Sequence, residues 1–213
     1  RDLSAAPEIS FLETPAGPER MALSPSGSAA VLYYGNPARV EVLTGLPSTP
    51  AAAWSADLPA VQAGLDALAV SDDATAVLYA AARQPSQVWL ATADAGQSFV
   101  LGLAAAPRVA FLIQSEDAAI ADSLTGDVFL VRHLKSAPIV ARLGGAEEGV
   151  SSPAAISAEP GNRRVFVANR QPGGVVGLAL DGGEALRIDC PFAPTALERM
   201  ESGSVFRLNE PGR

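Results

Sequence analysis

A unit of four short apolar segments recurs along this chain of 213 residues. Its clearest copy, residues 163–181, holds two apolar runs joined by the turn Pro172-Gly173-Gly174. The residue that follows the first segment marks each unit and recurs every 41 to 47 residues, at Ser24, Ser71, Gln114, Ser157 and Glu198. A period of about 40–50 residues with four strands per unit is typical of a β-propeller, in which each unit is one blade. The spacing therefore predicts an all-β propeller of four-stranded antiparallel blades.

The composition of the segments favours strands over helices. Residues 39–43 alternate polar and apolar side chains, as expected of a strand with one buried face. The apolar runs are short and rich in Val, Leu and Phe, and Pro and Gly, which are unfavourable inside helices, separate them. The main alternative, a helical repeat array of similar period, is therefore disfavoured. We expect each blade to be stabilised by its neighbours, because a small sheet cannot bury both of its faces alone.

We expect one domain over residues 1–213, with four recognisable blades and one partial blade. The approximate repeats are 18–58, 65–103, 107–143, 153–190 and 193–213, with residues 8–13 as an outer strand. Two arrangements stay open: the two ends share a blade and close a five-bladed ring, or the chain is a fragment of a larger propeller. The second is favoured because residues 1–7 form a poor third strand. An open ring would expose an apolar blade face, so we expect such a fragment to dimerise.

One unit also resembles a known family of repeats. The tetrad Phe166-Val167-Ala168-Asn169 resembles the name-giving tetrad of the YVTN-type bacterial propeller repeat. The family's next strand is matched at Val176, Leu178, Leu180 and Asp181. Residues 205–209 match in part, whereas the first three units have Gly35, Ala81 and Ser123 where the family has Asn. The resemblance implies a propeller fold and an exported bacterial protein, extracellular or periplasmic, but no particular reaction.

Charge and composition exclude several classes of partner. The net charge is −8 and the isoelectric point about 4.6, so the surface repels phosphate backbones and we expect no nucleic-acid binding. No apolar run reaches the roughly 18 residues of a membrane-spanning helix. The single cysteine, Cys190, rules out an intrachain disulfide. The single histidine, His133, rules out a site that needs two imidazoles.

The acidic pairs have two interpretations. Asp72-Asp73 and Glu116-Asp117 each follow the first strand of a unit, where they could form a calcium or acid–base site. Asp also caps its own backbone in tight turns, and this interpretation is favoured. For His133 a structural or surface role is favoured. The sequence contains no P-loop, zinc-ligand spacing or serine nucleophile elbow. We therefore predict no cofactor and no metal.

Ligands of propellers usually contact the turns between second and third strands and the connections between blades. We call this end of the blades the loop face, and the end with the first-to-second-strand turns the hairpin face. Candidate ligand-binding residues on the loop face are Asn36, Arg39, Arg83, Gln84, Arg108, Asp122, Asn169 and Arg170. The blade connections also carry Arg20, Glu147, Glu148 and Phe192. A ring of Arg and Asn can hold a carboxylate or a sugar; the alternative is an ordinary solvated rim.

These observations favour a non-catalytic propeller domain that binds an unknown protein or small ligand through the loop face. The alternative is a lactonase-like or other propeller hydrolase with a metal or acid site in the central channel. Asp122 and Glu147 are the only acids near the channel that could serve it, and a single histidine weighs against it.

Overall fold

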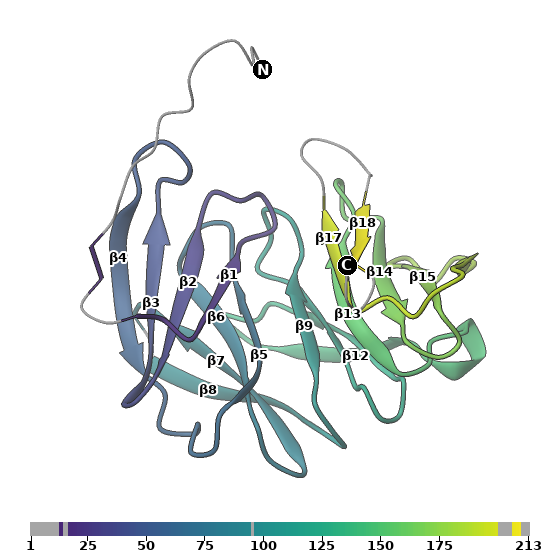
Figure 1. Cartoon of the computed structure of the whole chain (residues 1–213), viewed down its shortest axis with the longest axis horizontal. Coiled ribbons are helices and arrows are strands. Elements are labelled where there is room, and N and C mark those ends of the chain that lie inside the picture. The colour runs from purple at the N-terminus through teal and green to yellow at the C-terminus, as the bar shows by residue number, and fades with distance from the viewer. Residues whose placement is uncertain (1–12, 15–16, 95, 200–205, 210–213) are drawn as a thin grey trace.

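The computed structural model describes residues 13–14, 17–94, 96–199 and 206–209 (Figure 1). The described chain is β-structure apart from one short 3₁₀ helix, Ala146–Glu148. It forms four antiparallel four-stranded sheets and one two-stranded sheet. Within these ranges no helix is of a length and apolarity suited to crossing a bilayer. The prediction of an all-β propeller with four blades and one partial blade is confirmed.

Each blade is built from strands that follow one another in the sequence. Blade 1 contains β1 (Arg20–Leu23), β2 (Ala30–Gly35), β3 (Ala38–Thr44) and β4 (Ala51–Asp57). Blade 2 contains β5 (Leu65–Val70), β6 (Ala76–Ala81), β7 (Ser86–Thr92) and β8 (Gly96–Leu103). Blade 3 contains β9 (Arg108–Phe111), β10 (Ala118–Ala121), β11 (Val128–Arg132) and β12 (Ile139–Gly144). Blade 4 contains β13 (Pro153–Ala158), β14 (Arg164–Asn169), β15 (Gly174–Ala179) and β16 (Leu186–Asp189). The partial blade contains β17 (Ala196–Arg199) and β18 (Phe206–Asn209), and the expected outer strand at 8–13 lies outside the described residues except for Glu13.

The first strand of each blade lies beside the first strand of the next. β1 contacts β5, β5 contacts β9, β9 contacts β13, and β13 contacts β17. Figure 1 shows these strands following one another through the middle of the molecule, with the later strands of each blade farther out. They therefore surround the propeller axis, and all of them run from the loop face to the hairpin face.

Alternate residues of the second strand enter opposite interfaces between blades. In β6, Val77 and Tyr79 belong to the core between blades 1 and 2, whereas Leu78 belongs to the core between blades 2 and 3. In β10, Ile120 and Ala119 divide in the same way between the cores on the two sides of blade 3. This is why both strands are buried along their whole length and show no polar–apolar alternation. Abundant alanine at these positions lets neighbouring sheets approach closely.

The first turn of each complete blade is closed by the same backbone hydrogen bond. In each case a backbone N–H donates to the carbonyl of the residue five positions later, at 2.9 Å. The donors are Ser24, Ser71, Leu112 and Glu159. The repeat positions placed at Gln114 and Ser157 are therefore wrong by two residues. The apolar run of the third unit looked longer than β9 because Leu112, although it lies in the turn, packs into the core between blades 3 and 4. In the fourth unit, β13 extends to Ala158.

Candidate functional site

The hairpin face is held together by polar side chains that cross between blades. Asp72 of blade 2 accepts hydrogen bonds from Ser26 of blade 1, through its N–H at 2.7 Å and its hydroxyl at 2.6 Å. Its other carboxylate oxygen accepts the N–H of Gln114 in blade 3 at 2.7 Å. Partial burial alone would raise the pKa of Asp72, but the hydrogen bonds from Ser26 and Gln114 outweigh it and lower the pKa. One carboxylate thus joins three consecutive blades.

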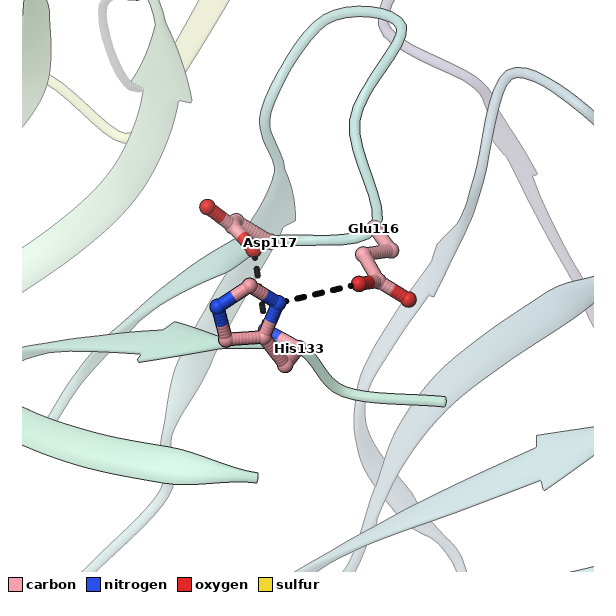
Figure 2. Close-up of side chains that lie close together, drawn as sticks. All are labelled: Glu116, Asp117 and His133. Carbon is pink, nitrogen blue, oxygen red and sulfur yellow. Dashed lines mark hydrogen bonds and ion pairs between the residues drawn. The ribbon is translucent and has the colours of Figure 1, made fainter. Parts of the chain in front are cut away.

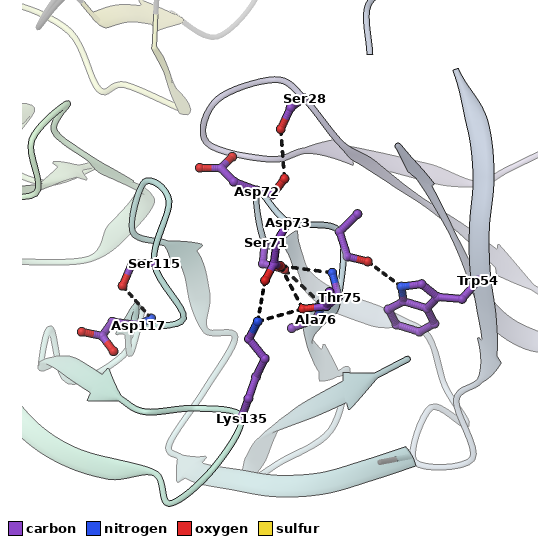
Figure 3. A network of polar contacts seen from close by, with 11 residues as sticks. Ser28, Trp54, Ser71, Asp72, Asp73, Thr75, Ala76, Ser115, Asp117 and Lys135 are labelled. Atoms are coloured by element: carbon purple, nitrogen blue, oxygen red, sulfur yellow. Dashed lines mark hydrogen bonds and ion pairs between the residues drawn. The ribbon is translucent and has the colours of Figure 1, made fainter. Parts of the chain in front are cut away.

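Further contacts between blades lie on the same face, and Figure 3 shows those made by Lys135 and Trp54. Lys135 of blade 3 donates to Asp73 at 2.6 Å and to Thr75 at 2.8 Å, both in blade 2. The indole N–H of Trp54 in blade 1 donates to the carbonyl of Ala74 at 2.5 Å. Asn162 of blade 4 joins blade 3, because its amide accepts from the Ile113 N–H and donates to the Ile113 carbonyl. The polar groups of this face are therefore largely engaged with one another.

The hairpin face also contains the candidate metal-binding cluster Glu116, Asp117 and His133 (Figure 2). One potential ligand atom from each residue lies within 4.8 Å of the others. His133 Nδ1 lies 3.2 Å from Glu116 Oε1. The backbone N–H of His133 donates to Asp117 Oδ1 at 3.0 Å. A divalent cation would find three donors here, but they already bind one another at an exposed turn. The sequence interpretation missed this contact, although antiparallel pairing of Ala118 with Val131 places Glu116 opposite His133.

A cavity of about 1230 Å³ opens at the hairpin face. The ends of all five first strands line it, together with Leu46 and Pro47 between β3 and β4. Because these five strands surround the propeller axis, the cavity is the hairpin-face end of the central channel, and Arg199 of the partial blade, which donates to the carbonyl of Pro25, lies at its rim.

The structure places the eight candidate residues at the loop face, four of them exposed, two half-buried and two buried. Asn36, Arg83, Gln84 and Arg170 are exposed, and their side chains have no hydrogen-bond or ion-pair partner among the described residues. Arg39 is half-buried in β3, with its guanidinium 4.5 Å from the centre of the Tyr34 ring. The exposed group can reach a ligand without breaking an existing contact.

Asp122 and Asn169 are instead buried, with exposed fractions of 2% and 3%. Asp122 accepts from the N–H of Ala104, in the connection before blade 3, at 2.6 Å, and from Leu124 at 2.8 Å. Asn169 accepts from the Ser151 N–H at 3.0 Å and donates to the Gly149 carbonyl at 2.8 Å, both before blade 4. Each side chain thus fixes the connection that leads into its own blade. Asp122, rather than Ser123, is the counterpart of Asn169.

Arg108 lies at the axis. It is the first residue of β9, and its Nε donates to the carbonyl of Ala154 in β13 at 2.7 Å. Arg20, the first residue of β1, reaches the carbonyl of Asp66 in β5 at 3.4 Å in the same way. Burial lowers the pKa of Arg108, and the nearby charge of Arg170 lowers it further; Asp66 acts in the opposite direction, and Arg20 adds to the lowering. Three arginines therefore converge here, although the sequence interpretation left Arg20 out of the candidate residues.

The arrangement is similar to that of solved propeller-like structures. No known protein family matches the sequence, and no curated protein does. A functionally unknown protein from Desulfotomaculum acetoxidans is 13% identical, with a TM-score of 0.62 over 89% of this chain and 62% of its own. A nidogen–laminin complex is 13% identical, with a TM-score of 0.57 over 81% of this chain and 64% of its own. The hydrazine synthase of Kuenenia stuttgartiensis is 12% identical, with a TM-score of 0.57 over 92% and 55%. The chain thus spans less than two thirds of these structures, and the likeness shows the fold alone.

Proposed function

We propose that this chain is a non-catalytic propeller domain that binds a protein or small ligand through its loop face. The observation that carries the proposal is the difference between the two ends of the blades. Polar side chains of the hairpin face, such as Asp72 and Asn162, bind neighbouring blades. Arg83 and Arg170 at the loop face are exposed and bind no described side chain. Exposed, unpaired arginines are common in the contact regions of protein complexes.

The fold is compatible with this role, because one structural neighbour was solved as a nidogen–laminin complex. The hydrolase alternative has less support. The carboxylate of Asp122 already accepts three backbone hydrogen bonds.

The resemblance to the YVTN-type repeat motivates a second proposal, on cellular location. Asn169 ends β14, as the family's Asn ends its strand, and its bonds to Gly149 and Ser151 explain why an amide suits this position. We propose that the protein is an exported bacterial propeller, extracellular or periplasmic. Fractionation of the source cells followed by immunodetection tests the location, and recovery from the cytoplasm alone contradicts it.

A capture experiment tests the binding role. Wild-type protein, the double variant Arg83→Ala/Gln84→Ala and the hairpin-face control Arg132→Ala are immobilised and exposed to extract of the source cells. We expect a partner retained by the wild type and the control to be lost from the double variant, because these two side chains lie at an exposed loop-face turn. Equal retention by all three proteins would refute the loop-face proposal.

A further inference from the structure

We propose that Arg20, Arg108 and Arg170 form an anion-binding site at the axial end of the loop face, and that its ligand is a carboxylate. This inference rests on the proposed function and names the ligand chemistry of the same face. It follows from where the three arginines lie, from their lack of ion-pair partners and from the charge of the rest of the chain.

The topology brings the three side chains to one end of the axis. Arg20 and Arg108 are the first residues of β1 and β9, two of the strands that surround the axis. Arg170 directly follows β14, whose last residue pairs with the first residue of β13, and its N–H donates to the Ser152 carbonyl. Because β1, β5, β9 and β13 are consecutive neighbours, these positions meet around the same opening.

Backbone carbonyls hold the half-buried arginine in place. The Nε of Arg108 donates to Ala154 at 2.7 Å, and its Nη1 donates to Pro107 at 3.1 Å and Ala106 at 3.3 Å. The guanidinium is therefore oriented before any ligand arrives, which lowers the entropy lost on binding. Its remaining terminal nitrogen, Nη2, has no hydrogen bond to a described residue.

The charges at this opening are unbalanced. None of the three arginines belongs to an ion pair among the described residues, whose ion pairs involve other side chains. Asp66 is the one acid whose charge acts on Arg108, against the two cations Arg170 and Arg20. Like charges that lie close together repel one another when no anion is bound. Such local conflicts are typical of functional sites.

A carboxylate fits this arrangement best. The planar guanidinium fork matches the two oxygens of a carboxylate, and hydrogen bonds between charged groups are the strongest in proteins. The overall negative charge repels an extended polyanion such as nucleic acid, while a small anionic group senses mainly the nearby arginines. The carboxylate can belong to a free small molecule or to an acidic segment of a protein partner.

The test is calorimetric titration at constant ionic strength with three probes. Citrate represents a free carboxylate, a capped tetra-aspartate peptide represents a protein segment, and inorganic phosphate tests the ligand class. We expect saturable 1:1 binding of at least one carboxylate probe to the wild type, and whichever binds more tightly identifies the source. Arg170→Gln should weaken this binding about tenfold or more, since it removes charge-assisted hydrogen bonds. Arg132→Gln, an exposed arginine at the hairpin face, is the matched control and should bind as the wild type does.

A second measurement separates ligand binding from a structural role. Arg170 is exposed and its side chain supports no described contact, so Arg170→Gln without ligand should melt at the same temperature as the wild type or higher. A structural arginine would lower the melting temperature when replaced. The same variant should lose the stabilisation that the carboxylate gives to the wild type.

Three outcomes would overturn the inference: no saturable carboxylate binding below about 10 mM, equal weakening by Arg132→Gln and Arg170→Gln, or tighter binding of phosphate than of both carboxylates. Failure here is distinguishable from failure of the proposed function. If Arg83→Ala/Gln84→Ala loses its partner while citrate and peptide do not bind, the loop face binds by other chemistry. If carboxylates bind but the double variant keeps its partner, the broader proposal is wrong.

Discussion

The carboxylate of Asp72 in blade 2 accepts the backbone N–H of Gln114 in blade 3 at 2.7 Å. Its other oxygen accepts from Ser26 in blade 1, so a single side chain joins the turns of three blades. Packing between sheets and polar contacts between turns thus support the same interfaces.

The variant Asp72→Asn tests how much these hydrogen bonds between blades contribute to stability. The amide keeps one acceptor oxygen, and its NH₂ group faces an N–H donor, so we expect a loss of about 1–3 kcal/mol in the free energy of unfolding at neutral pH. Urea denaturation measures it. Ser136→Ala, at an exposed turn of blade 3, is a suitable control and should change the stability little. A variant as stable as the wild type would show that the contact contributes nothing.

The pH dependence of stability gives a second prediction. The pKa values of Asp72, Asp73 and Asp127 are all lower in the folded protein than in model compounds. Carboxyls of this kind stabilise the fold above their unfolded pKa near 4 and lose that contribution as the pH falls through the folded pKa. The wild type should therefore lose stability between about pH 5 and pH 2. Asp72→Asn should show a shallower decline, and parallel curves for the two proteins would contradict the assignment.

Asp122 and Asn169 occupy equivalent positions in blades 3 and 4 but make different hydrogen bonds. Both carboxylate oxygens of Asp122 accept hydrogen bonds, whereas the amide of Asn169 accepts one and donates one. Asp122→Asn and Asn169→Asp hardly change side-chain volume, yet each should cost about 1–3 kcal/mol because a buried polar atom then faces the wrong partner. Thermal denaturation of the two variants checks this. Tolerance of both exchanges would mean that these side chains do not fix the blade connections.

The interfaces between blades should be sensitive to cavities. Ile120 is fully buried between blades 2 and 3, while Ile139 on the outer strand of blade 3 is 58% exposed. Ile120→Ala should lower the free energy of unfolding by about 2–5 kcal/mol, and Ile139→Ala by much less. Similar losses for the two variants would argue against stabilisation by packing of neighbouring blades.

Divalent cations test whether the cluster of Glu116, Asp117 and His133 is a metal site. Glu116 and His133 are exposed or half-buried and already contact each other. We therefore expect Zn²⁺ or Ca²⁺ at millimolar concentration to raise the melting temperature of the wild type by no more than it raises that of His133→Ala. A large rise confined to the wild type would establish a metal site at this turn, whereas a large and equal rise in both proteins would indicate a metal elsewhere, as the hydrolase alternative requires.

The strands could be predicted because their pattern is local. The alternation at residues 39–43 and the turn at Pro172-Gly173-Gly174 determine β3 and the β14–β15 connection through neighbouring residues alone. The contacts between blades could not be predicted from the sequence. Asn162 and Ile113, for example, are 49 residues apart, and their pairing depends on how the blades stack. The turn at Leu112 was misplaced for a similar reason, since its burial comes from the next blade.

The sequence predicted where the candidate site lies but not which of its residues are free to bind a ligand. The loop face could be located from the order of strands, which placed Arg83 and Arg170 at its turns. Sequence reasoning could not separate Asn169, which binds the backbone, from Arg170 beside it, which is exposed. Arg20 had one usable signal: like Arg108, it begins the first strand of its unit.

Hydrogen exchange by NMR tests most directly the claim that the hairpin-face turns join neighbouring blades while the loop-face turns at Asn36 and Arg83 stay available. The amides of Ser26 and Gln114 donate to Asp72, and that of Ile113 donates to Asn162. We predict that these three turn amides exchange slowly, at rates approaching those of the strands, whereas the amides of Asn36 and Arg83 exchange rapidly. Exchange of the Gln114 amide as fast as that of Arg83 would contradict the account.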